Sequence, residues 1–179
     1  MIQLKRIRTS DQELYKYAER LLTTSFPLEE YRPLSQWRKY TDENEQFYNN
    51  IILDQGKPVG IISFWDLGNF YYIEHFAIDE ELRNKGYGQT VLDLLEKNYD
   101  IPMILEVELP TNATAQRRII FYQRYHFEVW DREYVQPPYR PNGAAVPMML
   151  MSRGNLSCEK DFDAVQTKLY QVVYHVAED

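Results

Sequence analysis

Three apolar segments in the middle of the chain place the strongest constraint on its fold. They are QFYNNIIL at 46–53, KPVGIISFWDL at 57–67 and NFYYIEHFAI at 69–78. Each is rich in β-branched and aromatic residues, which favour strands. Between them stand Asp54-Gln55-Gly56 and Gly68-Asn69, which are typical of hairpin turns. The pattern therefore predicts three antiparallel strands joined as a meander.

Helical and strand-like segments alternate on both sides of this meander. Before it, the pattern predicts a strand over 1–8, a helix over about 9–26 and a short helix from about Ser35. After it, the expected elements are a helix over 89–99, a strand over 102–110, a helix over 112–125, and strands over 126–136 and 144–153. This order predicts an α+β fold with a mixed, mostly antiparallel central sheet of about seven strands flanked by helices.

The last part of the chain predicts an extra C-terminal helix. Its apolar residues recur at helical spacing: Phe162, Val165, Leu169, Val172, Val173 and Val176. We therefore expect a domain over 1–153 and a helical extension over 154–179. The extension packs either on its own domain or on a dimer partner, and the sequence leaves both open.

Bulk composition narrows the function classes. The chain has 179 residues, 44% of them hydrophobic, which is enough for one substantial core. Its formal net charge of −7 disfavours nucleic acid as a partner. The single cysteine, Cys158, rules out an intrachain disulfide, and no long apolar run is present. We expect a cytoplasmic protein without a membrane partner.

A glycine-containing turn, RNKGYGQ at Arg83–Gln89, lies where a strand-like run changes to a helical one. The first amides of a helix lack partners within the helix, and glycine lets them approach a phosphate closely. The turn therefore suits a phosphate or pyrophosphate. Two nucleotide motifs are excluded: Val91 stands where a dinucleotide fingerprint needs a small residue, and GQT lacks the lysine of a phosphate-binding P-loop. An ordinary surface turn with incidental cations stays open.

The segment FAIDEELRNKGYGQTVLDLL resembles the acyl-CoA-binding motif of the GNAT superfamily of N-acyltransferases. The core of that motif is Q/R-x-x-G-x-G/A, and Arg83, Gly86 and Gly88 occupy its defined positions. A later segment, IIFYQRYHF, is similar to a second family segment, with His126 where the family usually has glycine. The resemblance covers about residues 1–153.

The resemblance implies how acetyl-CoA, the acyl donor, is held. Main-chain amides of the turn bind the pyrophosphate, and the free main chain of a splayed strand pairs with the pantetheine arm. The pyrophosphate residues are Arg83, Asn84, Lys85, Gly86, Tyr87, Gly88 and Gln89, and the pantetheine residues are Phe76, Ala77 and Ile78. No metal is expected.

Acetyl transfer to an amine requires the amine to lose a proton. A lysine-like amine, with a pKa of about 10.4, is neutral in only about one molecule in two thousand at pH 7. Glu74 is the candidate base because it directly precedes the pantetheine residues, and His75 is its rival. Tyr122, at the family's tyrosine position, is the candidate acid that protonates the leaving thiolate. Ordinary structural roles for Glu74 and Tyr122 stay open.

The expected function is N-acetyltransfer to a primary amine of a small molecule or peptide. Aromatic residues are expected to line the acceptor site: Phe26, Tyr31, Trp37, Trp65, Tyr134 and Tyr139. Two other functions stay open: a non-catalytic regulatory module that binds acyl-CoA, and a binder of a different phosphate ligand. A homodimer also stays open.

Overall fold

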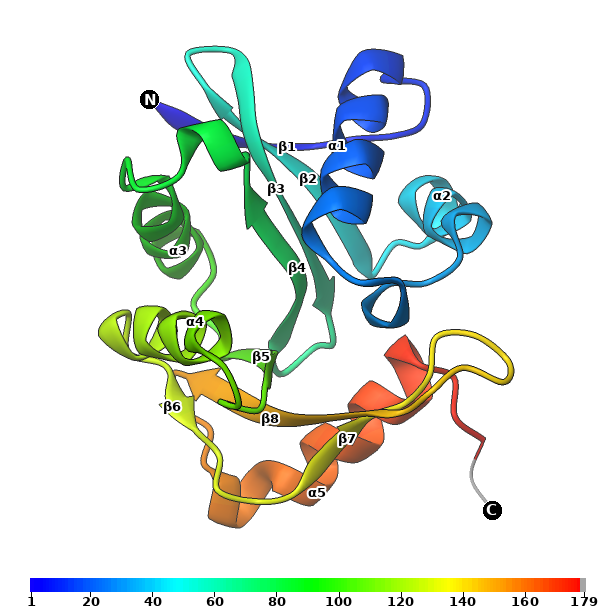
Figure 1. Ribbon diagram of the computed structural model, residues 1–179, viewed down its shortest axis with the longest axis vertical. Coiled ribbons are helices and arrows are strands. Elements are labelled where there is room, and N and C mark those ends of the chain that lie inside the picture. Colours follow the sequence, from blue (N-terminus) through cyan, green and yellow to red (C-terminus); the bar gives the residue numbers. More distant parts are fainter. Residues whose placement is uncertain (178–179) are drawn as a thin grey trace. The chain divides into compact units, whose positions relative to one another are not determined.

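The computed structural model describes residues 1–177, and within them it has eight strands and five α-helices (Figure 1). Two units are distinguished by their internal contacts, and the chain passes between them more than once. The first unit comprises Met1–Asp66 and Ile73–Asp100, and the second comprises Leu67–Tyr72 and the chain from Ile101 onward.

Four neighbouring strands form the sheet of the first unit. In spatial order they are β1 (Ile2–Arg6), β2 (Phe47–Asp54), β3 (Lys57–Asp66) and the part of β4 (Tyr71–Ile78) that starts at Ile73. The pairs β1–β2 and β2–β3 are antiparallel. Between β2 and β3, Gln55 and Gly56 both have positive φ angles, of 49° and 79°, as a tight hairpin turn requires. The meander predicted from the apolar segments is confirmed.

Three helices cover this sheet. The helices α1 (Gln12–Ser25) and α2 (Leu34–Glu43) lie on one face, and α3 (Tyr87–Asn98) lies on the other (Figure 1). Helix α1 begins later than expected because the Asp11 carboxylate accepts a hydrogen bond from the Arg8 amide, at 2.9 Å, and so holds a turn before it.

The second unit is built around one long strand. That strand, β8 (Val146–Arg153), pairs antiparallel with β5 (Met103–Glu108), β6 (Glu128–Val129) and β7 (Tyr134–Gln136). The single strand expected over 126–136 is thus two short strands, which raises the expected count of about seven to eight. The break lies at Trp130, whose carbonyl accepts a hydrogen bond from the Arg132 amide at 3.0 Å and turns the chain.

Two helices flank β5 and β8, with α4 (Ala113–Arg124) on one side and α5 (Cys158–Lys168) on the other (Figure 1). Helix α5 continues as a π-helical turn over Leu169–Val173, and Phe162 packs against Trp130 at 6.2 Å between ring centroids. The extension therefore packs on its own unit. Val176 is 41% exposed, so its expected place in the buried stripe is wrong.

These elements confirm the α+β class with mostly antiparallel strand pairing and an extra C-terminal helix. The domain boundary expected at 153 stays a prediction. Across residues 1–177, none of the helices has the length and apolar character needed to cross a bilayer.

Candidate functional site

The glycine turn presents unused main-chain donors at the start of α3. Helix α3 begins at Tyr87, two residues earlier than expected, and its N-cap Gly86 has a φ of 83°. The amides of Tyr87, Gly88 and Gln89 donate no hydrogen bond to any of residues 1–177. A Cβ at Gly86 would meet nothing within 4 Å, so the space before these amides is open. Unused N–H groups at the start of a helix can bind an anion, so the pyrophosphate site expected here stays a prediction.

Side chains anchor this turn to two other parts of the first unit. The Arg83 guanidinium donates from Nε to the Ile78 carbonyl at 3.1 Å, which joins the turn to the end of β4. The Tyr87 hydroxyl donates to Asp54 Oδ2 at 2.9 Å, which joins it to the β2–β3 hairpin. Sequence reasoning missed Asp54 because no local pattern indicates a partner 33 positions away.

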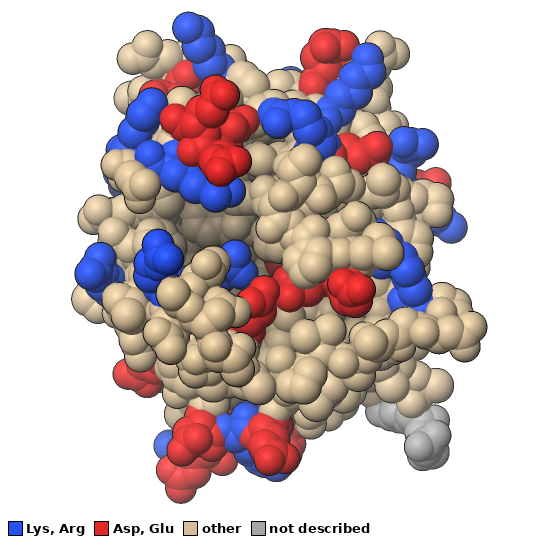
Figure 2. All heavy atoms as spheres, in the orientation of Figure 1, with Lys and Arg blue, Asp and Glu red and all other residues tan. Residues whose placement is uncertain are grey.

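Charge around the turn is mixed rather than cationic. Lys and Arg side chains intermingle with Asp and Glu side chains over the region of Glu80–Leu82 and the start of α3 (Figure 2). Residues 79–85 carry three carboxylates and two cationic groups. Attraction for a phosphate must therefore come from the main-chain amides and the helix dipole, with Arg83 and Lys85 as local contributions.

Strand β4 exposes main chain where the pantetheine arm is expected. The Glu74 side chain has no exposed surface, but the residue as a whole is half-buried. The accessible surface of Glu74 therefore belongs to its main chain. Phe76 and Ile78 are also half-buried. On the other side of β4, a Cβ at Gly60 of β3 would lie 2.5 Å from the Ala77 carbonyl oxygen. Gly60 therefore allows β3 to approach this segment closely, and sequence reasoning missed it.

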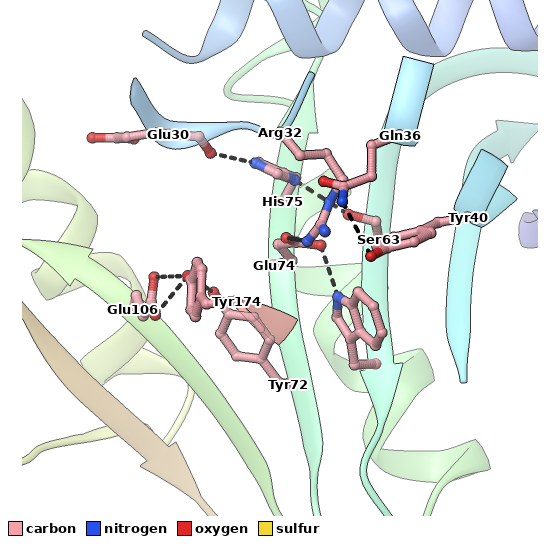
Figure 3. Close-up of polar contacts among 11 residues, drawn as sticks. Glu30, Arg32, Gln36, Tyr40, Ser63, Tyr72, Glu74, His75, Glu106 and Tyr174 are labelled. Atoms are coloured by element: carbon pink, nitrogen blue, oxygen red, sulfur yellow. Dashed lines mark hydrogen bonds and ion pairs between the residues drawn. The ribbon is translucent and has the colours of Figure 1, made fainter. Parts of the chain in front are cut away.

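The Glu74 carboxylate forms a buried ion pair with Arg32 (Figure 3). The two side chains are 0% and 1% exposed, and the Trp65 indole donates to Glu74 Oε2 at 2.8 Å. Burial alone would raise the pKa of Glu74, but Arg32, His75 and Trp65 together lower it below its usual value. The candidate base is therefore ionised and enclosed by side chains of its own unit.

His75 is a packed, hydrogen-bonded histidine. Its Nε2 lies 2.8 Å from the Glu30 carbonyl, which can only accept, so Nε2 carries the proton (Figure 3). Its Nδ1 lies 3.5 Å from the Ser63 hydroxyl, and its ring contacts Phe26 at 4.8 Å. Burial lowers the pKa of His75. These contacts favour a structural role over that of rival base.

Tyr122, the candidate acid, is a buried residue of α4 in the second unit. Its ring packs against Phe121 and Phe127 at 5.2 and 5.4 Å between centroids. Burial raises the pKa of Tyr122 to about 12, so its hydroxyl is protonated at neutral pH. Within residues 1–177, no hydrogen bond of this hydroxyl contributes to its pKa, which burial raises and the nearby Arg118 lowers slightly.

The aromatic residues expected around the acceptor fall into two groups. Four are buried core residues, so their predicted place as accessible walls is wrong: Tyr31, Trp37, Trp65 and Tyr134. Phe26 and Tyr139 are half-buried and can still contact a ligand. The difference arises because large aromatic rings supply most of the buried area in both units, which their sequence pattern does not reveal.

His126, at the family's glycine position, has a φ of 67° and follows the end of α4. A left-handed residue at a helix end favours glycine, which explains the family pattern. Histidine tolerates the same conformation here at some cost in backbone strain.

Comparison with known proteins agrees with this geometry. Residues 12–127 match the sequence profile of the Acetyltransferase (GNAT) family. A solved structure from Bacteroides thetaiotaomicron, assigned as a GNAT-family acetyltransferase, is 47% identical, covers 98% of this chain and 99% of its own, and superposes with a TM-score of 0.94. The chain belongs to the GNAT acetyltransferase family and is an acyltransferase of that class.

Two further relatives are more distant. YjbC of Bacillus subtilis (strain 168), assigned as an acetyltransferase, is 28% identical over 109 residues, which are 60% of this chain and 54% of YjbC. The chain thus spans about half the length of that curated relative. An aminoglycoside 6'-N-acetyltransferase complexed with coenzyme A is 17% identical, with 84% and 96% of the two chains covered and a TM-score of 0.60. At that identity the likeness concerns the fold alone.

Proposed function

We propose that this protein transfers an acetyl group from acetyl-CoA to a primary amine of a small molecule or peptide, by direct attack in a ternary complex. The observation that carries the proposal is the set of three unused amides at Tyr87, Gly88 and Gln89, behind the open space at Gly86. Family membership and the coenzyme A complex of a protein with the same fold support it.

The residues of the first unit fit a bound acyl-CoA. The amides that begin α3 would hold the pyrophosphate, with Arg83, Asn84, Lys85 and Gly86 shaping the turn. The main chain of β4 at Phe76–Ile78 would pair with the pantetheine amides as an added strand does; Phe76 and Ile78 are half-buried and Ala77 is buried.

Acetyl-CoA supplies an activated acyl carbon: the amine nitrogen bonds to it, the carbon–sulfur bond breaks, the amine loses a proton and the thiolate gains one. On the protein side, an amide of β4 stabilises negative charge on the carbonyl oxygen. The Tyr122 hydroxyl, which its raised pKa keeps protonated at neutral pH, is the proposed donor to the departing thiolate. A thiol is a good leaving group already, so this donor makes the smallest contribution.

Glu74 is the proposed proton acceptor, and Arg32 keeps its carboxylate ionised. Because the Glu74 side chain is fully enclosed, the amine proton would reach it through an intervening group rather than by direct contact.

Two measurements test this function. Isothermal titration with acetyl-CoA measures binding, and a thiol-release assay over a panel of primary amines measures transfer. The proposal expects saturable binding and amine-dependent release of free thiol. Binding without amine-dependent release would identify a regulatory module instead, and tighter binding of a nucleotide that lacks pantetheine would identify a different phosphate-ligand binder.

A further inference from the structure

Within the first unit, the hairpin that joins β2 and β3 supports the strand where the pantetheine arm is expected. At Gly60, β3 comes so close to β4 that a Cβ would lie 2.5 Å from the Ala77 carbonyl oxygen. The Val59 carbonyl accepts a hydrogen bond at 2.9 Å from the amide of Asp79, which directly follows β4. The β3 side of the hairpin therefore holds the end of β4 in place.

The β2 side of the same hairpin holds the start of α3. Asp54, the last residue of β2, accepts a hydrogen bond at 2.9 Å from the hydroxyl of Tyr87, the first residue of α3. The Asp54 side chain is 29% exposed and Tyr87 is half-buried, so solvent shields this hydrogen bond only in part. One hairpin is thus joined to both segments of the proposed coenzyme site.

A carboxylate at this position does not attract a phosphate. The hydrogen bond from Tyr87 lowers the pKa of Asp54 below its usual value, and the Met1 amino group, 3.2 Å from its other oxygen, lowers it further. Asp54 is therefore negatively charged at neutral pH. A hydroxyl donor orients a carboxylate without cancelling its charge. If Asp54 assists the binding of a pyrophosphate, it must do so by some means other than electrostatic attraction.

The start of α3 needs an anchor because its N-cap is glycine. Gly86 has a φ of 83° and no side chain that could accept from the first amides of the helix. In α4, by contrast, the Asn112 side chain accepts from the Ala115 amide at 2.8 Å. Such a cap uses an amide that an anion would need. The pair of Asp54 and Tyr87 holds the helix start from outside and leaves its amides unused.

We infer that Asp54 is a positioning residue of the coenzyme site: by holding the Tyr87 side chain, it fixes the direction of the first three amides of α3. This inference rests on the proposed function only in naming the pyrophosphate as the anion that these amides bind. The hold of Asp54 on the helix start does not require a coenzyme or acetyl transfer.

Three possible roles of Asp54 predict different changes in the affinity for CoA. If only its charge mattered, Asp54→Ala would remove a repulsion and CoA would bind more tightly. If the pair only stabilised the fold, the free energy of unfolding would fall and the affinity would not change. If Asp54 positions the amides, the same variant should bind CoA more weakly although it has lost a negative charge. The sign of the change therefore separates the three roles.

Relaxation of ¹⁵N nuclei in the free protein tests the anchor without any coenzyme. In the wild type, the order parameters of the first three amides of α3 should be about 0.85, as in a rigid backbone. They should fall toward about 0.6 in Asp54→Ala and in Tyr87→Phe, which keeps the ring and the main chain. The matched control is Tyr48→Phe, on the same strand as Asp54, whose ring stacks on Phe64 at 4.9 Å between centroids; it should not change them. Unchanged order parameters in both variants of the pair would overturn the inference.

Isothermal titration with CoA and with pantetheine, which lacks the pyrophosphate, tests the consequence for binding. Tyr87→Phe and Asp54→Ala should each weaken CoA binding about fivefold to tenfold and leave pantetheine binding unchanged. Asp54→Asn keeps an acceptor oxygen without the charge, so it should bind CoA at least as tightly as the wild type. The matched control is Glu81→Gln, which removes an exposed carboxylate from the short helix before the turn and should not weaken CoA binding. Unchanged or tighter CoA binding in Asp54→Ala would overturn the inference.

The two experiments also separate this inference from the proposed function. If the variants loosen the amides but the wild-type protein binds no CoA, the proposed function fails while the hold of Asp54 on the helix start stands. If the wild type binds acetyl-CoA and transfers its acetyl group, and both variants of the pair bind CoA as the wild type does, the inference fails while the proposed function stands.

Discussion

Replacing Glu74 with glutamine should destabilise the protein strongly, because Arg32 would stay charged in a site with no access to solvent. Both side chains are at most 1% exposed, so solvent cannot compensate for the lost partner. Breaking a buried ion pair from one side costs about 3–5 kcal/mol, a large part of a total stability of roughly 5–15 kcal/mol. The combined variant Arg32→Met/Glu74→Gln removes both charges and keeps an acceptor for the Trp65 indole, so we expect its stability to lie within about 1–2 kcal/mol of the wild type.

Urea unfolding at pH 7, followed by tryptophan fluorescence, measures these free energies of unfolding. If Glu74→Gln lowered the free energy of unfolding by less than about 1 kcal/mol, the charge of Arg32 would not depend on Glu74 for its compensation. The combined variant then isolates the chemistry in a folded protein. If Glu74 receives the amine proton, the kcat of the combined variant should fall by roughly 10²–10⁴-fold, while its affinity for acetyl-CoA should not change. Normal turnover in the combined variant would remove Glu74 from the mechanism.

Four further predictions follow from the same contacts. Gly86→Glu should abolish CoA binding by repelling the pyrophosphate, whereas Gly86→Ala, whose Cβ meets no atom, should cost about 1–2 kcal/mol of stability through its positive φ and retain CoA binding. Gly60→Ala should cost about 1–3 kcal/mol of stability and weaken acetyl-CoA binding, because its Cβ would push against β4. Tyr122→Phe should lower kcat several-fold and spare acetyl-CoA affinity, both measured by titration and thiol release. Burial lowers the pKa of folded His75, so the unfolded chain binds a proton more readily, and the free energy of unfolding should fall as pH drops below about 6.5; His75→Gln should reduce this slope.

For each of these four predictions, one outcome would contradict it. CoA affinity retained in Gly86→Glu would refute the anion site. Wild-type stability and affinity in Gly60→Ala would show that β3 does not constrain β4. Equal kcat in Tyr122→Phe would assign the thiolate proton to another source, and an unchanged pH slope in His75→Gln would show that its titration is not linked to folding.

Local sequence patterns were enough for the strand order of the first unit. The apolar runs, together with Gln55-Gly56 and Gly68, specify where strands end and turns begin, because positive φ angles need particular residues. The helix after Gly86 followed from the same reasoning. The break between β6 and β7 could not be predicted in this way. It depends on how Trp130 packs against the extension rather than on the composition of the strand itself.

Partners that are distant in sequence were not predictable. Arg32 and Glu74 are 42 positions apart, and nothing near either residue indicates the other. The family resemblance indicated Glu74 as a base from its position before Phe76 but could not reveal that an arginine encloses it. Glu106 of β5 is likewise hydrogen-bonded to Tyr174, which is 68 positions away. His126, by contrast, carried a local sign of its conformation, because it stands at a glycine position of the family.

The central claim is that the first amides of α3 hold the pyrophosphate of acetyl-CoA. Amide chemical shifts in ¹⁵N-labelled protein test it directly, with CoA compared with pantetheine, which lacks the pyrophosphate. We expect CoA to shift the amide signals of Tyr87, Gly88 and Gln89 strongly and pantetheine to leave them unchanged. Unmoved signals from these three amides at saturating CoA would contradict it.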